Sequence, residues 1–156
     1  MNECIFCKIV AGEIPSYKIL EDEEFLAFLS IFPNTEGVTV VIPKKHYPSY
    51  VFDLPDEVLN KLMSFTKKVA KMIDSNLNDV GRTAVVFEGF GVDHIHAKLF
   101  PMHGTANMKE WKPLELGAKV NNYFEKYPGY ISSHDCDKVG KDNLEKTAKK
   151  IRGEKK

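Results

Sequence analysis

The sequence lacks the segments that carry a protein into or across a membrane. Residues 1–4 hold no basic stretch of the kind that opens a secretory signal, and no apolar run approaches the ~20 residues that span a bilayer. The three cysteines, an odd number in a chain without such a signal, argue against a framework of disulfides. From these features we expect a cytoplasmic protein with no membrane partner.

An excess of charge of either sign is also missing. Lys and Arg number 22 and Asp and Glu number 22, so the chain has no overall field that would attract nucleic acid. An anionic ligand must therefore be held by a local site. With 156 residues, no internal repeat and no low-complexity linker, the chain is expected to form one domain and perhaps a short appendage.

The strongest chemical signal is the run DHIHAKLF, residues 93–100, which Pro101 follows. As a strand, this run places His94, His96 and Lys98 on one face and apolar residues on the other. Alternate side chains of a strand lie about 6.6 Å apart, so both imidazoles would line one wall of a site. In a helix they would point about 200° apart. The alternation and the proline favour a strand ended by Pro101. The alternative is an edge strand whose polar face is merely wet.

A long helix is predicted over residues 53–76. Asp53 is its candidate cap, and apolar residues recur at spacings of three and four, as expected for a helix that covers a sheet. The residues of this stripe are Val58, Leu62, Phe65, Val69 and Met72.

Short strands and two further helices complete the predicted elements. β-Branched residues bounded by turn formers predict strands over residues 17–21, 25–29, 37–43 and 83–87. Helices are predicted over residues 114–125 and 142–152. The mixture of strands and a covering helix indicates an α+β protein.

A short turn at residues 88–92 would join the last two predicted strands as a hairpin. Gly89 and Gly91 leave its backbone N–H groups accessible, and N–H groups that converge on one point suit a phosphate group. Two glycines in a hairpin turn are ordinary, so this signal is weak by itself. It gains weight because the turn lies beside His96.

Cys4 and Cys7 have the spacing of metal ligands. A closed tetrahedral zinc site needs two more ligands, for which the histidines are candidates. The alternative is a pair of small buried hydrophobic residues. A redox dithiol usually lies where a strand leads into a helix of a βαβ unit, a pattern not seen here. His134 and Cys136 could also bind metal, although a loop cysteine near a histidine is more often incidental.

Three blocks in this order resemble the histidine-triad (HIT) superfamily: CIFCKIVAGEIP at residues 4–15, VIPKKH at residues 41–46, and HIH at residues 94–96. The likeness covers most of residues 4–101. It implies an antiparallel sheet of about five strands with the long helix packed on it, in a domain of residues 1–105. It also implies a homodimer. Residues 106–156 would form a helical C-terminal extension.

The resemblance further implies a nucleotide-binding hydrolase or transferase. His96 would attack the α-phosphorus of a nucleoside phosphoramidate or a dinucleoside polyphosphate and form a nucleotidyl-histidine intermediate. A structural zinc ion would be held by Cys4, Cys7, His46 and His94. The implied nucleotide-binding residues are Phe6, Ile9, Ile14, Phe28, Ser30, Ile31, Glu88, Gly89, Gly91 and Lys98. For each of the apolar ones, the alternative is plain core packing.

The sequence departs from the family pattern at two functional positions. Lys98 replaces the third histidine of the motif, which keeps a cation near the phosphates without a neutral imidazole. Ser30 stands where an aspartate commonly holds the ribose hydroxyls, and one hydroxyl is a poorer bidentate partner. Two other functions therefore stay open: a catalytically weak nucleotide-binding module, and a zinc-dependent interaction protein that uses its C-terminal segment.

Overall fold

The computed structural model describes residues 4–107, 125–129, 131, 140 and 142–143. The chain divides into two compact units, Met1–Trp111 and Lys112–Lys156. The predicted division after residue 105 stays a prediction. Most of residues 114–125 and 142–152, for which helices were predicted, lie outside the described residues, as do His134 and Cys136. Among the described residues, no helix is long and apolar enough to cross a membrane.

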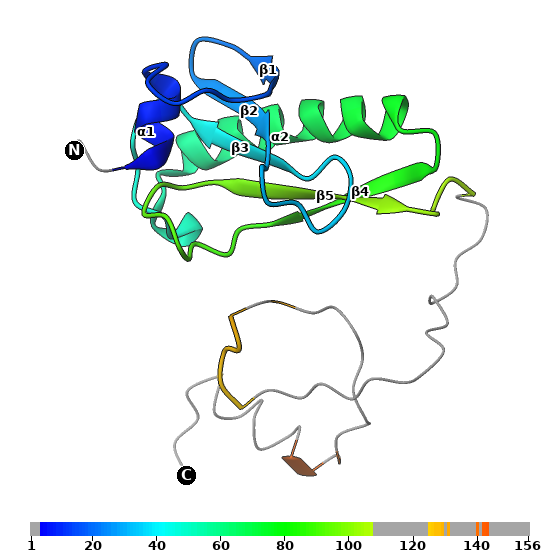
Figure 1. Cartoon of the computed structure of the whole chain (residues 1–156). Coiled ribbons are helices and arrows are strands. Elements are labelled where there is room, and N and C mark those ends of the chain that lie inside the picture. The colour runs from blue at the N-terminus through cyan, green and yellow to red at the C-terminus, as the bar shows by residue number, and fades with distance from the viewer. Residues whose placement is uncertain (1–3, 108–124, 130, 132–139, 141, 144–156) are drawn as a thin grey trace. The chain divides into compact units, whose positions relative to one another are not determined.

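One five-stranded antiparallel sheet organises the first unit (Figure 1), and the order of its strands is β1-β2-β3-β5-β4. The helices and strands are α1 (Ile5–Val10), β1 (Lys18–Glu21), β2 (Phe25–Leu29), β3 (Thr39–Pro43), the 3-10 helix η1 (Val51–Asp53), α2 (Asp56–Asn76), β4 (Val80–Val86) and β5 (Ala97–His103). The predicted α+β architecture, a five-stranded antiparallel sheet with one long helix packed on it, is confirmed.

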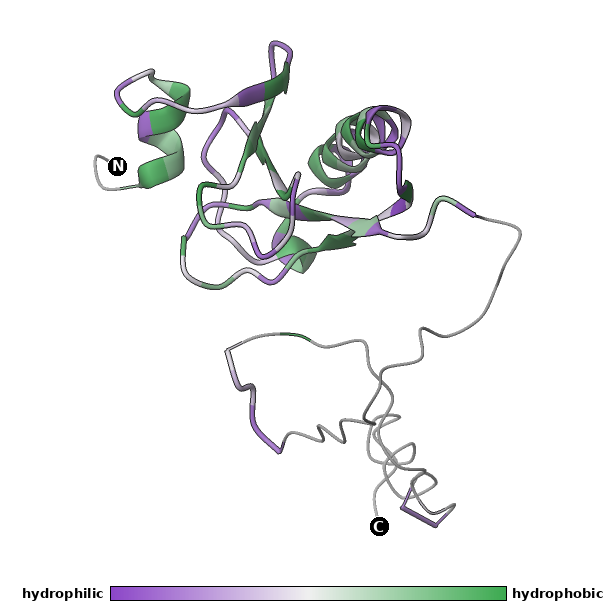
Figure 2. Ribbon diagram, turned by 45° about the vertical axis from the view of Figure 1, so that its right-hand side comes forward, coloured by the Kyte–Doolittle hydropathy of each residue, from purple (hydrophilic) through white to green (hydrophobic). Residues whose placement is uncertain are grey.

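The two faces of the sheet belong to two different apolar clusters. Because successive side chains of a strand point to opposite faces, Ala27 and Val41 pack with α2. Their neighbours in the same strands, Leu26 and Ile42, point to the other face and pack with the apolar residues of α1. Figure 2 shows α1 and α2 on opposite sides of the sheet. The short N-terminal helix, which the sequence did not predict, thus covers the face that α2 leaves open.

The long helix differs from its prediction at its start and on one face. It begins at Asp56, and Asp53 ends η1 instead of capping α2. Val58, Leu62, Phe65 and Val69 pack in the core as expected. Met72 is 38% exposed, whereas Ile73 is buried. The buried stripe advances by four residues after Val69, which the 3.6-residue period permits as readily as three.

The histidine run does not form the predicted strand. β5 begins at Ala97, so His94 and His96 lie in the connection that precedes it, and β5 continues through Pro101 to His103. Pairing with β3 ends at Leu99, while Pro101 pairs with Thr83 of β4. A residue without an N–H group is tolerated there because only one neighbouring strand remains.

Candidate functional site

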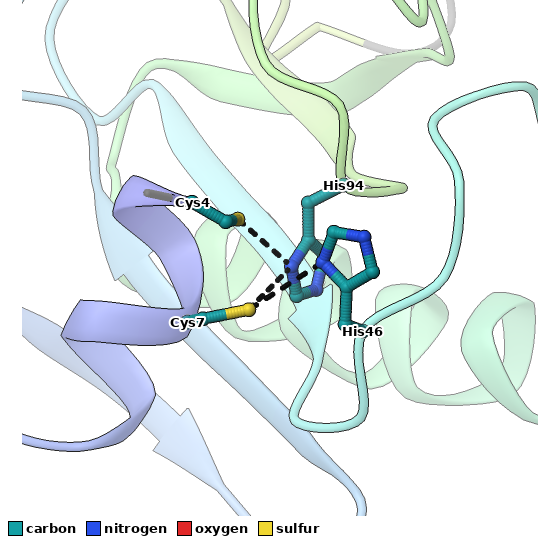
Figure 3. A group of neighbouring side chains, drawn as sticks. All are labelled: Cys4, Cys7, His46 and His94. Carbon is teal, nitrogen blue, oxygen red and sulfur yellow. Dashed lines mark hydrogen bonds between the residues drawn. The ribbon is translucent and has the colours of Figure 1, made fainter. Parts of the chain in front are cut away.

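Four potential metal ligands from three segments meet at one point (Figure 3). Cys4 directly precedes α1 and Cys7 follows one turn later, so residues three apart place both thiols on the same side. His46 comes from the loop after β3, and His94 from the connection before β5. Their ligand atoms all lie within 4.8 Å of one another.

The separations of these atoms suit a small tetrahedral ion. The Sγ atom of Cys4 lies 3.4 Å from Nδ1 of His94, and the Sγ atom of Cys7 lies 3.4 Å from Nδ1 of His46 and 3.6 Å from Nδ1 of His94. Zinc bonded to sulfur and nitrogen at the usual lengths with tetrahedral angles would set these pairs about 3.5 Å apart. The cluster can therefore hold a metal ion with little rearrangement.

His94 is held in the form that binds metal. Its Nε2–H donates to the carbonyl oxygen of Pro43 at 2.9 Å, which leaves the lone pair on Nδ1, the atom that faces the thiols. Burial lowers the pKa of His94 and keeps its ring neutral. A metal-bound imidazole usually donates its other ring N–H to a fixed acceptor in this manner.

The thiol of Cys7 is not activated by the protein alone. Burial raises its pKa, and the hydrogen bond that the Cys7 S–H donates to Cys4 and the charge of Cys4 act in the same direction. A coordinated cation has the opposite effect, because a thiol that binds metal is deprotonated. The electrostatics of the pair thus suit a metal ligand better than a free nucleophile.

His96 is also buried, so the two imidazoles do not line an open wall. His94 is 0% exposed and His96 is 2% exposed. Both rings pack edge to face against Phe6 of α1, with ring centroids 5.8 Å and 5.2 Å from that of Phe6. The predicted strand face does not carry both imidazoles, because both residues precede β5 and pack against α1.

The hydrogen bond of His96 sets its tautomer. Nδ1–H donates to the carbonyl oxygen of His94 at 2.7 Å, so the lone pair is on Nε2. Burial lowers the pKa of His96, which keeps the ring neutral.

Lys98 and Glu88 form an ion pair beside this ring. Lys98 Nζ lies 3.2 Å from Glu88 Oε2, and their side chains are 35% and 17% exposed. The charge of Lys98 adds to the effect of burial on the pKa of His96, and the charge of Glu88 opposes it. The structure therefore brings together His96, Lys98 and the start of the predicted phosphate turn.

The turn itself is anchored to the segment that follows β3. A Cβ atom at Gly89, where φ is +69°, would lie 3.1 Å from the carbonyl oxygen of Ser49. The carboxylate of Asp93 accepts the N–H of Ser49 at 2.9 Å, and the N–H of Ile95 donates to the carbonyl of Tyr47. Gly91 also has a positive φ, of +87°, but lies in open space.

The apolar residues expected to bind the nucleotide do not all meet. Phe6, Ile9 and Phe28 share a buried cluster, and Ile14 packs against it, an arrangement that core packing alone also explains. Ile31 is 68% exposed and lies outside that cluster. The Oγ atom of Ser30 accepts the N–H of Phe32 at 3.2 Å.

Sequence reasoning missed the residues that position the site. The carbonyl of Pro43 orients His94, and Asp93 holds the loop of Ser49. Pro43 acts through a main-chain group, which leaves no signature in a side-chain pattern. Asp93 stands next to His94 in the sequence, but its hydrogen-bond partner Ser49 lies 44 residues away, so no local pattern indicated this contact.

Comparisons with known proteins agree with this geometry. A family model described as HIT domain matches residues 11–105. Protein hit of Bacillus subtilis is 39% identical over 107 residues, which cover 66% of this chain and 73% of that relative. The adenosine 5'-monophosphoramidase of Saccharomyces cerevisiae is 40% identical over 98 residues, which cover 63% of this chain and 61% of that enzyme.

Solved structures show the same fold. A protein of Streptococcus mutans has a TM-score of 0.66 at 28% identity, and the match covers 99% of this chain and 86% of that protein. A Zn-bound histidine triad family protein from Mycobacterium smegmatis has a TM-score of 0.58 at 32% identity, and the match covers 68% of this chain and 79% of that protein.

Proposed function

Because the chain belongs to the HIT domain family, we propose that it is a nucleotide hydrolase or nucleotidyltransferase. Its substrate is a nucleoside phosphoramidate or a dinucleoside polyphosphate, cleaved at the α-phosphorus. The observation that carries the proposal is the 2.7 Å hydrogen bond from Nδ1 of His96 to the carbonyl of His94, because it leaves a lone pair on Nε2 of a neutral ring. The similarity to adenosine 5'-monophosphoramidases supports the substrate class.

In the first step, Nε2 of His96 attacks the α-phosphorus. A bond forms between Nε2 and phosphorus, and the bond from phosphorus to the leaving group breaks, its electron pair going to the leaving group. A leaving amine takes a proton from solvent, and a leaving phosphate departs as an anion. The ring then carries a positive charge, since Nδ1 keeps its proton. The carbonyl of His94 stabilises that charge because it accepts the Nδ1–H.

In the second step, water attacks the phosphorus of the nucleotidyl-histidine. The bond between phosphorus and Nε2 breaks, its electron pair returns to Nε2, the attacking water gives a proton to solvent, and a nucleoside monophosphate leaves. In a transferase, another nucleophile takes the place of water. Lys98 and the backbone N–H groups around Gly89 and Gly91 interact with the non-bridging oxygens, which need donors more than they need an acid or a base.

We assign the binding of the nucleotide itself to five apolar residues and to Ser30. Phe6, Ile9, Ile14 and Phe28 contribute apolar surface near the base, and Ile31, which is exposed, contributes from the loop after β2. The hydroxyl of Ser30 still has its proton to donate to the ribose, since its oxygen accepts the N–H of Phe32.

Zinc is the metal that we propose for the cluster of Cys4, Cys7, His46 and His94. The two thiols and two imidazoles are a sound zinc set, and a similar solved structure is described as Zn-bound. With four protein ligands the ion would have no open position, so it would supply structure and not chemistry. It would join α1 to the loops that carry His46 and His94.

The resemblance also supports a homodimer and a cytoplasmic location. Size-exclusion chromatography coupled to light scattering tests the first, because a dimer has twice the 17.7 kDa mass of the chain. Fractionation of cells that express the tagged chain tests the second. A mass of 17.7 kDa, or recovery outside the cytoplasmic fraction, would contradict the respective proposal.

A second candidate function is a nucleotide-binding module with little or no catalysis. The 2% exposure of His96 and the engagement of Lys98 with Glu88 favour it, since both restrict access to the reacting groups. This candidate predicts nucleotide affinity by calorimetry without product, and a His96→Ala variant that still binds.

Turnover with a matched variant separates the two functions. The protein is incubated with adenosine phosphoramidate and with a dinucleoside polyphosphate, and His96→Ala serves as the control. The hydrolase predicts product from the wild type alone, and phosphate label from the substrate trapped on His96 in an acid-labile bond. Failure to turn over either substrate, or equal turnover by the variant, would overturn the catalytic proposal.

A further inference from the structure

A carboxylate lies where the proposed function requires an anion to bind. Glu88 begins the turn assigned to the phosphate oxygens, and its side chain is 17% exposed. Like charges brought together at a binding site weaken binding, so a half-buried carboxylate here carries a cost for any phosphate ligand. Its partner is the ammonium of Lys98, 3.2 Å away.

Both charged side chains lie close to His96 in the fold. Lys98 follows His96 by two residues and pairs with Val86, the last residue of β4, two residues before Glu88. Because Lys98 Nζ and Glu88 Oε2 are 3.2 Å apart, a group bonded to the ring of His96 meets both charges. A phosphorus group at Nε2 meets an ion pair whose charges sum to zero, and not the single positive charge that Lys98 alone would present.

We propose that Glu88 is a specificity-determining residue that makes the site favour a phosphorus group with one negative charge over a group with two. The proposal rests on the proposed function, since it concerns the same phosphate position. The α-phosphorus of a phosphoramidate or of a dinucleoside polyphosphate carries one charge. The phosphate of a nucleoside monophosphate carries nearly two at neutral pH, because its second pKa is about 6.

The selection follows from the sum of the two charges. Both kinds of ligand gain the same hydrogen bonds from Lys98, but the extra charge of the dianion gains nothing more, because Glu88 cancels the attraction. Specificity arises here from a repulsive element and not from a new contact. The site thus retains the nucleotide conjugate and releases the nucleoside monophosphate that hydrolysis produces.

Two ligands that differ by this one charge test the inference. AMP and its O-methyl phosphate ester are titrated by calorimetry into the full chain at pH 8, and the measured quantity is the ratio of Kd for AMP to Kd for the ester. Glu88→Gln keeps the shape of the side chain and removes its charge, so this ratio should fall about fivefold. Glu88→Asp keeps the charge and should leave the ratio within about twofold of the wild type.

Lys98→Met provides a second variant that does not depend on the first. It leaves Glu88 without its counterion, and the ratio should then rise about fivefold. If the wild type binds both ligands but neither Glu88→Gln nor Lys98→Met changes the ratio, the inference is overturned and the proposed function stands. If the wild type binds neither ligand, the proposed function fails and takes the inference with it.

Discussion

The carbonyl oxygen of His94 lies 2.7 Å from Nδ1 of His96, so one residue serves both centres of this protein. The imidazole of His94 faces the thiols of Cys4 and Cys7, and its main chain orients the neighbouring ring. The metal cluster and the proposed nucleophile are therefore coupled through a single residue, without a shared ligand.

This coupling predicts that loss of the metal lowers activity through His96. Cys7→Ala removes one of four ligands. Loss of a residue that only hydrogen-bonds a metal ligand typically lowers metal affinity about 10- to 100-fold, so loss of a ligand itself should lower it at least as much. We expect a lower kcat with a smaller change in KM, and a lower melting temperature of the variant. Elemental analysis should find one zinc per wild-type chain and less in the variant. Unchanged kcat in metal-free protein would show that the two centres are independent.

The two glycines of the phosphate turn should differ in their tolerance of alanine. Both have positive φ, so Gly89→Ala and Gly91→Ala each cost about 1 kcal/mol of stability. Only Gly89→Ala also forces a Cβ to within 3.1 Å of the Ser49 carbonyl, which should displace the turn and raise KM for nucleotide. Urea denaturation and steady-state kinetics measure both effects, and Gly91→Ala is the matched control.

The corrected face of α2 predicts a contrast between neighbouring residues. Ile73 is 7% exposed and Met72 is 38% exposed. Ile73→Ala should therefore lower the free energy of unfolding by about 2–4 kcal/mol through lost burial and a cavity. Met72→Ala should cost well under about 1 kcal/mol. Urea denaturation curves decide between this face and the one predicted from the sequence, which would reverse the order.

His103 predicts a pH-dependent contribution to stability. Its Nδ1–H donates to Asp79 at 2.9 Å and its Nε2–H to the carbonyl of Glu36 at 2.9 Å, and these contacts raise the pKa of His103, with the Glu36 carbonyl the larger cause. The stabilisation is complete below the unfolded-state pKa, about 6.5, and is lost as pH rises through the higher folded-state pKa.

A difference measurement isolates this contribution. The gap in unfolding free energy between wild type and His103→Asn should narrow as pH is raised from 6 to 9. Lowering the pH below 4 should also narrow it, because the contact with His103 lowers the pKa of Asp79, whose contribution is lost as pH falls through that value. A gap that is constant from pH 4 to 9 would contradict the assignment of charge to His103.

Sequence reasoning reached the fold and the members of the metal cluster, and it failed on how the site residues are presented. Thr39 to Ile42 are all β-branched and the segment Thr39–Pro43 is buried throughout, so local pattern and tertiary environment agreed there. The alternation around His94 and His96 looked like a strand, but pairing with β3 and β4 begins only after them. Period 2 in a sequence indicates a strand only where a neighbour supplies the hydrogen bonds.

By itself, the sequence predicted strands and one long covering helix from its patterns, and its resemblance to a family named five strands and the two thiols and two imidazoles that the structure brings together. The tertiary structure alone decided that Phe6 buries His96, that Glu88 neutralises Lys98, and that Pro43 and His94 set the tautomers. These relationships depend on distances between segments far apart in the chain. Such distances are set by how the two helices pack on the sheet, and no local pattern encodes them.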